Sequence, residues 1–430
     1  MSFDLETLLR QRAIQTHFQP ILSLRKQQVM GVEALSRGVV AVPGQPLQQI
    51  PPLVLFECAR AEGRLLELDR LCCQTALRSF AQLQQVQDDL ILFLNLHLGS
   101  VQQESAQFHD LIHVQQNYGI EPRRIVIEVL EHEIEDLERF KRDIEALREC
   151  GFLIALDDVG AGHSNLDRIA FVRPDILKID RVLTQDIHSD YHKQEVFKSL
   201  VNLSEKIGGW TVSEGLETED DALMALDLGG DMMQGYFFAR PQLMQLPLAS
   251  GEIEYSKDNL QDTAHHFKKR IIERIEAKRS QHEKRVQIVD GLRHALQQAP
   301  EDEFEMRLHN VVIHHSLIES VCVLNDCGVQ ISDTITQMER EEEQKTVIFA
   351  PPHKGTDHSM KEYFYCLVEA GIDPFFSNPY VPLPSGDLCV SVATRFAGKH
   401  GTPFVLCVHL NAMNSLTLEP EPFALQANRV

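Results

Sequence analysis

Short apolar runs alternate with longer helical patterns over residues 17–240 of the chain. The runs are five to eight residues long, and between them apolar residues recur at the spacing of amphipathic helices. The predicted strands are His17–Leu24, Val29–Ser36, Leu90–His97, Ile125–Glu131, Leu153–Asp158, Ile176–Asp180, Thr211–Glu217 and Met232–Phe238. The clearest helical stretches are Leu65–Leu77, Leu137–Leu147, Glu195–Ile207 and Ala222–Leu228.

This alternation predicts an α/β domain over residues 1–250. Only RKQQ separates the first two runs, which predicts a hairpin, whereas the later runs form repeated strand–helix units. Eight strands with intervening helices favour a closed TIM-like (β/α)8 barrel with one irregular antiparallel strand. An open, doubly wound sheet is the alternative.

The segment 251–298 has a different character, because it is rich in charged and amide side chains and contains no proline. It predicts a linker made of one long helix or two shorter ones. Its middle, AKRSQHEKR, is wholly polar apart from one alanine, so a continuous coiled coil is not favoured over a helix that lies on its own domains. A possible apolar seam consists of Leu260, Phe267, Ile271, Ile275, Val289, Leu292 and Leu296.

A third pattern covers residues 299–415 and predicts a small α+β domain, followed by a loose tail at 416–430. A turn is expected at Asn325–Gly328 and a hairpin turn at Ser385–Gly386. The predicted helices are Phe304–Ile318 and His358–Ala370, and the predicted strands are Val321–Leu324, Val329–Ile331, Val347–Phe349, Leu388–Phe396 and Phe404–Leu410.

Charge and composition disfavour several classes of protein, namely nucleic-acid-binding, disulfide-linked and membrane-spanning proteins. The formal net charge of −22 disfavours binding to DNA or RNA, because an acidic surface repels a polyphosphate backbone. The nine cysteines form no C-x-x-C pair, which suggests buried thiols in a reducing compartment. There is no apolar run of signal-peptide type and none long enough to span a membrane, so a cytoplasmic location is expected.

Acidic and amide side chains gather at the ends of the predicted strands. In a barrel of this type the functional site lies where strands pass into the following loops. Burying several carboxylates together is costly unless cations compensate them, and oxygen ligands without cysteine or histidine indicate Mg²⁺ or Mn²⁺. Adjacent Asp157 and Asp158 suit two ions that share one carboxylate. The residues of this kind are Glu33, Asn95, Glu128, Glu131, Asp157, Asp158, Asp180, Glu214, Glu217 and Gln234.

Two basic residues accompany these acids and point to phosphate chemistry. Lys178 supplies a point charge for a phosphate or for an attacking water, and Arg37 can bind a phosphate oxygen. A site of two hard cations with such residues is typical of phosphodiester cleavage.

In order along residues 1–250, these motifs resemble those of the EAL family of cyclic di-GMP phosphodiesterases. The matching segments are FQP at 18–20, EALSR at 33–37, Asn95, the pair Glu128 and Glu131, DDVGAG at 157–162, KID at 178–180, EGLE at 214–217 and QGY at 234–236. The resemblance implies a TIM-like barrel that opens one phosphodiester of cyclic di-GMP to give linear pGpG.

The resemblance also implies a role for each matching residue. Glu33, Asn95, Glu128 and Asp157 would hold one metal ion, and Asp157, Asp158 and Glu217 the second. Lys178 would orient the attacking water, Glu214 would act as general base, and Glu131 would hold the loop that carries the two aspartates. Arg37, Gln234 and Asp180 would complete the substrate site. A homodimer formed through the barrels is implied as well.

Two alternatives to this enzyme remain open. The barrel can be a receptor that binds cyclic di-GMP with little or no cleavage, or a metal-dependent enzyme for another phosphoester. The segment from GTDHSM at 355–360 to FVLCVHLN at 404–411 resembles a PAS-like or Cache-like sensor domain. That resemblance implies a module that binds a small molecule and regulates the barrel. A purely structural role in dimerisation is the alternative.

Overall fold

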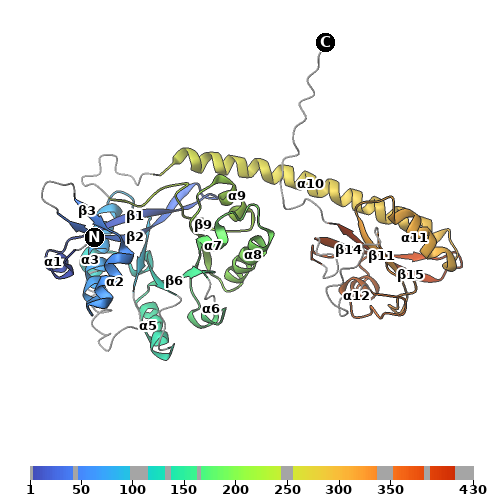
Figure 1. Cartoon of the computed structure of the whole chain (residues 1–430), viewed down its shortest axis with the longest axis horizontal. Coiled ribbons are helices and arrows are strands. Elements are labelled where there is room, and N and C mark those ends of the chain that lie inside the picture. Colours follow the sequence, from blue (N-terminus) through green and yellow to red (C-terminus); the bar gives the residue numbers. More distant parts are fainter. Residues whose placement is uncertain are drawn as a thin grey trace, which may run out of the picture. The chain divides into compact units, whose positions relative to one another are not determined.

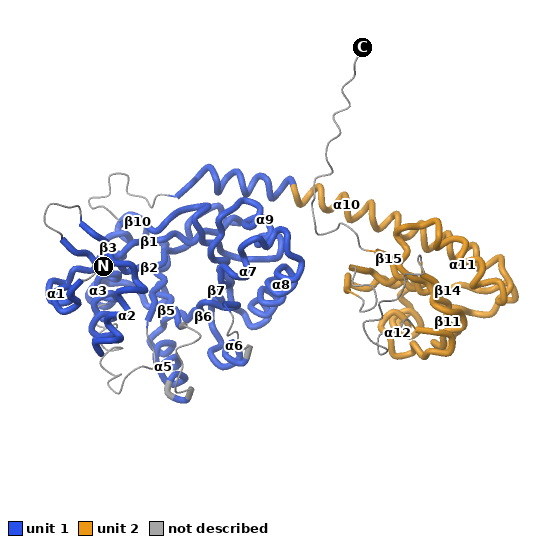
Figure 2. Tube along the Cα trace, viewed as in Figure 1, with its two compact units in different colours: residues 1–269 blue, residues 270–430 orange. Residues whose placement is uncertain are grey.

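The structure is a computed structural model, and it describes residues 3–41, 47–96, 115–130, 137–161, 166–243, 255–336, 352–381 and 388–411 (Figure 1). The chain divides into two compact units, Met1–Lys269 and Arg270–Val430 (Figure 2). Each unit has its own sheet and its own hydrophobic core, so each is described separately.

The first unit is built on a closed ring of eight strands. The ring closes because β1 pairs with both β2 and β9, and β1 runs antiparallel to both neighbours while the other pairs in the ring are parallel. This confirms the TIM-like barrel with one antiparallel strand and excludes the open sheet. The ring strands are β1 (Ile14–Ser23), β2 (Gln28–Val40), β4 (Ile91–Asn95), β5 (Ile125–Leu130), β6 (Leu153–Val159), β7 (Ile176–Ile179), β8 (Trp210–Ser213) and β9 (Met232–Met233). Two short strands, β3 (Gln48–Ile50) and β10 (Gln242–Leu243), extend the sheet beyond the ring.

Helices pack against the outside of the barrel (Figure 1), and most of their apolar faces share one core with outward-facing strand residues, whereas the first two helices of the chain pack in a separate cluster with Ile14 and Ile50. The four predicted helices are present; Leu65–Gln84 and Leu137–Glu149 end later than expected, whereas Tyr191–Lys206 and Glu219–Asp227 begin earlier and end one residue sooner. None of the helices that the structure describes is long and apolar enough to cross a membrane. The helices of this unit are α1 (Leu5–Arg10), α2 (Pro52–Ala61), α3 (Leu65–Gln84), α5 (Leu137–Glu149), α6 (Leu166–Val172), α7 (Arg181–Thr184), α8 (Tyr191–Lys206) and α9 (Glu219–Asp227), with a 3-10 turn at Pro122–Arg124.

Two of the later strands are shorter than the sequence predicts. The run Thr211–Glu217 forms a strand only as far as Ser213, because the chain turns at Gly215, whose φ is +64°. The run Met232–Phe238 pairs only over its first two residues. Hydrophobicity alone did not distinguish these paired residues from the buried loop residues that follow them.

A second, smaller core fills the inside of the barrel. It consists of one apolar side chain from each of seven ring strands: Ile21, Phe93, Val126, Ala155, Ile176, Val212 and Met232. Successive residues of a strand point to opposite faces, so the residues between these face the outer helices. On β5, for example, Ile125 and Ile127 belong to the outer core and Val126 to the inner one.

The predicted linker forms one continuous helix, α10 (Lys257–Gln297). Leu260 near its start is buried in the core of the barrel unit. Val289, Leu292 and Leu296 near its end are buried in the core of the second unit. Ile275, in the polar middle of the helix, is 60 % exposed, so the predicted seam is not one continuous buried stripe.

The second unit is a five-stranded antiparallel sheet in the order β12-β11-β15-β14-β13. The predicted helix Phe304–Ile318 ends at Val312, and Ile318 instead begins a strand that pairs with Leu410. The elements are α11 (Phe304–Val312), β11 (Ile318–Asn325), β12 (Ile335–Thr336), α12 (Glu362–Val368), β13 (Phe375–Phe376), β14 (Cys389–Ala397) and β15 (Pro403–Asn411), with a 3-10 turn at Glu301–Glu303.

Several expectations about this part of the chain lie outside the described residues. They are the strand Val347–Phe349, the turn Ser385–Gly386 and the tail 416–430. The assignment of the unit to a PAS-like or Cache-like family stays a prediction.

Candidate functional site

Six of the predicted site residues stand two positions after side chains that fill the inside of the barrel. Asn95 follows Phe93, Glu128 follows Val126, and the same offset recurs on four more strands or strand ends. Residues two apart on a strand share a face, so the polar residue of each pair points into the barrel at its carboxyl-terminal end. The other pairs are Ala155 with Asp157, Ile176 with Lys178, Val212 with Glu214 and Met232 with Gln234.

Lys178 lies at the centre of the site, and its side chain is 1 % exposed. Its Nζ atom is 2.6 Å from Glu128 Oε1, 2.7 Å from Glu214 Oε1 and 3.0 Å from Asp157 Oδ1. Glu33 Oε2 is farther away, at 3.8 Å. One ammonium group therefore faces four carboxylates, and the site has an excess of negative charge that divalent cations are suited to balance.

Burial and mutual repulsion change the protonation of these groups. Burial raises the pKa of Glu128 well above its usual range, and the neighbouring carboxylate of Glu33 raises it further. Burial likewise raises the pKa of Glu214, although Lys178 opposes the shift. For Lys178, burial alone would lower the pKa, but the carboxylates around it outweigh burial and raise it, so this side chain stays charged.

Metal binding to this site should release protons. Glu128 and Glu214 hold their protons to higher pH than ordinary carboxyl groups, and a metal ligand must be deprotonated. We therefore expect the affinity for Mn²⁺ to fall as the pH is lowered. Calorimetric titration in two buffers of different ionisation enthalpy measures the protons released. Equal heats in both buffers would contradict this expectation, and Glu214→Gln should release fewer protons than the unchanged chain.

Two amide side chains donate hydrogen bonds to Glu33, and a third accepts one from the second of these amides. Asn95 Nδ2 donates to Glu33 Oε1 at 3.3 Å and to Glu128 Oε2 at 2.7 Å. Gln234 Nε2 donates to Glu33 Oε2 at 2.6 Å and to Gln19 Oε1 at 3.2 Å. Gln19 was not among the predicted site residues, although the FQP segment that contains it was noted. The buried Oε1 atom of Gln234 has no hydrogen-bond partner among the described residues, so it is available to a ligand.

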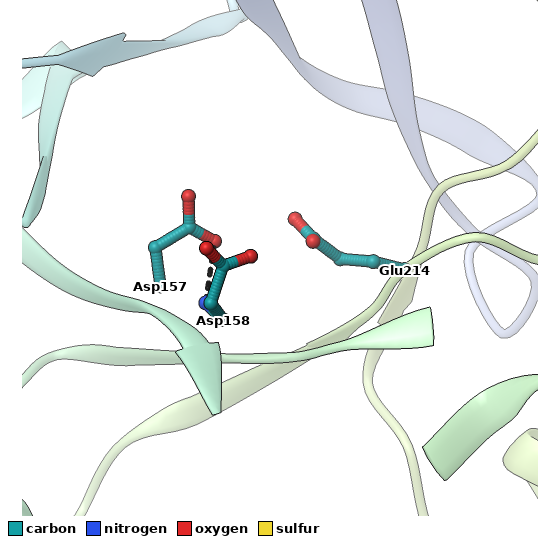
Figure 3. Close-up of side chains that lie close together, drawn as sticks. All are labelled: Asp157, Asp158 and Glu214. Atoms are coloured by element: carbon teal, nitrogen blue, oxygen red, sulfur yellow. Dashed lines mark hydrogen bonds between the residues drawn. The ribbon is translucent and has the colours of Figure 1, made fainter. Parts of the chain in front are cut away.

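Asp157, Asp158 and Glu214 bring carboxylate oxygens within 4.8 Å of one another (Figure 3). Asp158 adopts a left-handed backbone with φ of +54°, which is uncommon outside glycine, and its N–H donates to Asp157 Oδ1 at 3.0 Å. This strained turn aims both aspartates toward Glu214. Carboxylates from the end of β6 and from the loop after β8 fit a hard divalent cation, and among the described residues they form a group that could hold one.

Three of the predicted site residues make hydrogen bonds or ion pairs outside the cluster of carboxylates around Lys178. Glu217 pairs with Arg181 at 3.0 Å, and Asp180 caps α7 by accepting a hydrogen bond from the N–H of Val182 at 2.8 Å. Arg37 is partly buried and donates to the carbonyl of Ser36 at 2.9 Å. Glu131 lies outside the described residues.

A cavity of about 230 Å³ opens onto the carboxylates. The loop after β8 and the loop after β9 form much of its wall. These loops are pressed together, since a Cβ atom at Gly235 would lie only 2.0 Å from the carbonyl oxygen of Leu216. The cavity is lined by Gln19, Glu33, Arg181, Glu214, Gly215, Glu217, Gln234, Gly235 and Tyr236.

The chain is similar in sequence to a known domain family and in both sequence and structure to individual proteins. The model of the EAL domain family matches residues 3–241, which is more than half of the chain. YkuI of Bacillus subtilis, described as an uncharacterized EAL-domain containing protein, is 28 % identical over 381 residues, covering 86 % of this chain and 89 % of YkuI. The crystal structure of YkuI in complex with substrate c-di-GMP and calcium covers 96 % of this chain and all of that one, with a TM-score of 0.76 and 24 % identity.

Two further relatives match the barrel. A probable cyclic di-GMP phosphodiesterase of Escherichia coli K12, PdeI, is 31 % identical over 229 residues, which is 52 % of this chain and 28 % of PdeI. The structure of the PaMucR phosphodiesterase in its c-di-GMP complex is 26 % identical, with a TM-score of 0.50, and covers 56 % of this chain and 96 % of that one. The likeness to YkuI therefore extends over both units, whereas these two relatives match little more than half of the chain.

Proposed function

The chain belongs to the EAL domain family, and from this premise we propose that its barrel is a metal-dependent phosphodiesterase that hydrolyses cyclic di-GMP to linear pGpG. In this reaction a water oxygen bonds to one phosphorus atom and the bond from that phosphorus to the 3′ oxygen breaks. The ring opens, and the product carries one 5′-phosphate and one free 3′-hydroxyl. The family and the names of PdeI and PaMucR support this choice of substrate.

The observation that carries the proposal is the convergence of four buried or partly buried carboxylates on Lys178, with Asp158 beside them. Glu33, Asn95, Glu128 and Asp157 would hold one Mg²⁺ or Mn²⁺ ion, and Asp157, Asp158 and Glu214 the other. A bound pair of ions would offset the charge of the phosphate and lower the pKa of the attacking water.

The remaining residues orient the reactants. Lys178 is fixed by its carboxylate partners and would hold the attacking water or a phosphate oxygen. Gln234 presents an unpartnered amide oxygen beside Glu33. Glu214 combines a raised pKa with a place at the cavity, which suits a general base as well as a ligand.

One assay tests the proposal and its two alternatives. Purified protein is incubated with cyclic di-GMP and Mn²⁺, and the products are separated by chromatography. A phosphodiesterase of the proposed class yields pGpG, and chelation of the metal stops the reaction. Tight binding without any product would identify a receptor, and turnover of another phosphoester with cyclic di-GMP inert would identify a different enzyme.

We also propose that the second unit regulates the barrel in a homodimer. The observation behind the regulatory role is the single helix α10, whose ends are buried in the cores of the two units, and the homodimer is what the resemblance to the EAL family implies. A change in the second unit, such as the binding of a small molecule, would act on the helix that carries Leu260 into the barrel core.

Removing the second unit should therefore change turnover or oligomeric state. The truncated chain should end at Lys269, since a chain ending near residue 250 would lose Leu260 and Ala264, both buried in the barrel unit. We expect the cyclic di-GMP turnover to change several-fold or the dimer to dissociate, measured by product formation and by sedimentation. Equal rates and equal oligomeric state for the two chains would refute regulation.

A further inference from the structure

Arg181 is the cationic side chain among the described residues that line the cavity. Three glutamates, Glu33, Glu214 and Glu217, share that lining with it. We propose that Arg181 binds the second phosphate of the cyclic dinucleotide, the one that does not react. This inference rests on the proposed function, because it assumes that the ligand carries two phosphodiesters.

The charge of the ligand favours a cationic contact to its second phosphate. A cyclic dinucleotide carries one negative charge on each of its two phosphates, and only one phosphate can lie against the ions at the reacting centre. The other phosphate would otherwise face the glutamates of the cavity in a chain whose net charge is −22. A guanidinium group matches a phosphate with two parallel N–H donors, which makes arginine well suited to this contact.

The fold holds the Arg181 stem in one place. Gly215 has a φ of +64°, and a Cβ atom there would lie 2.5 Å from the Cβ and 2.6 Å from the Cγ of Arg181. The arginine stem therefore lies directly on the backbone of the loop that carries Glu214. The hydroxyl of Thr184, at the other end of α7, donates to the carbonyl of Glu214. The stem of Arg181 and the backbone of Glu214 therefore lie next to each other, held by contacts between α7 and the loop after β8.

The guanidinium of Arg181 has two partners within the protein and keeps further N–H donors for a ligand. Its Nη1 is 3.0 Å from Glu217 Oε1, and its Nε donates to Gln185 Oε1 at 3.1 Å. A guanidinium has five N–H donors, so these contacts leave donors for phosphate oxygens. The side chains of Arg181 and Glu217 are 48 % and 42 % exposed, and such exposed pairs contribute little stability. A phosphate can therefore join or replace Glu217 at small cost.

The test compares Arg181→Gln and Arg181→Lys with the unchanged chain. For cyclic di-GMP we expect Arg181→Gln to raise KM by about ten- to a hundredfold while kcat changes by less than about threefold, because the lost contact is the same in the ground and transition states. The KM of Arg181→Lys should lie between the KM of the unchanged chain and that of Arg181→Gln, since lysine keeps the charge and loses the paired donors. Arg64→Gln is the control, because Arg64 also pairs with a glutamate, Glu67, with side chains 29 % and 54 % exposed, and does not line the cavity.

A substrate with one phosphate separates this role from a general effect on the site. Arg181→Gln should hydrolyse bis(p-nitrophenyl) phosphate at the rate of the unchanged chain. Equal loss with both substrates, or an unchanged KM for cyclic di-GMP, would overturn the inference while leaving the proposed function intact.

Failure of the proposed function is recognised separately. If the unchanged chain forms no pGpG, calorimetric binding of cyclic di-GMP in the presence of Ca²⁺ replaces KM as the measurement. If the protein is a receptor, an affinity for cyclic di-GMP that is about ten- to a hundredfold weaker in Arg181→Gln would still support the inference. Absence of binding to the unchanged chain would overturn both.

Discussion

Glu214→Gln should lower kcat for cyclic di-GMP by about a thousandfold or more. The glutamine keeps the size of the side chain but removes the charge from a carboxylate whose Oε1 is 2.7 Å from Lys178 Nζ and that lies with Asp157 and Asp158 (Figure 3). An amide neither accepts a proton at neutral pH nor offsets the charge of a divalent ion, so both roles considered for Glu214 are lost. Formation of pGpG at saturating Mn²⁺ measures the effect.

The affinity for Mn²⁺ distinguishes the two roles of Glu214. Weaker binding of the metal by the glutamine variant would identify a ligand, as the three-carboxylate group suggests, and unchanged binding would identify a general base. Glu145→Gln is the control, because Glu145 is an exposed acid on α5. A Glu214→Gln variant with at least a tenth of the original kcat would remove Glu214 from the mechanism.

Lys178→Met should reduce both turnover and the stability of the metal-free barrel. Methionine fills a similar volume but leaves Glu128, Glu214 and Asp157 without the ammonium that now lies within 3.0 Å of each. Removing one partner from a buried ionic cluster costs roughly 3–5 kcal/mol. The loss of unfolding free energy should be largest in the presence of a chelator and smaller with Mn²⁺, because bound ions also offset the charge of the carboxylates.

Chemical denaturation with EDTA and with Mn²⁺ measures this difference in unfolding free energy. Lys206→Met, at an exposed lysine near the end of α8, shows the effect of the substitution itself. We also expect kcat to fall by about a hundredfold or more, since a charged group beside the reacting phosphate is lost. A Lys178→Met variant that is as stable in EDTA as the unchanged chain would show that the lysine does not balance the carboxylates.

The barrel could be predicted from the sequence because apolar residues recur at different spacings in strands and in helices. Apolar residues at helical spacing separate the short runs, and parallel neighbours joined by helices leave few architectures. Element ends were less certain. β8 stops at Ser213 because Gly215 turns the chain, and α11 stops at Val312 although apolar residues recur at 313, 317 and 318. Burial gives both strands and tightly packed loops an apolar sequence, so hydrophobicity did not mark these ends.

The sequence by itself determined which side chains point into the barrel. Alternation along each strand fixes direction, so an apolar residue such as Val126 and the acid two positions later share one face. The tertiary structure decided which of these side chains meet. It placed Lys178 among four carboxylates, joined Gln19 to Gln234 and paired Glu217 with Arg181. Local periodicity sets the direction of a side chain, but closure of the ring and the packing of its loops set the distances between side chains that are far apart in the sequence.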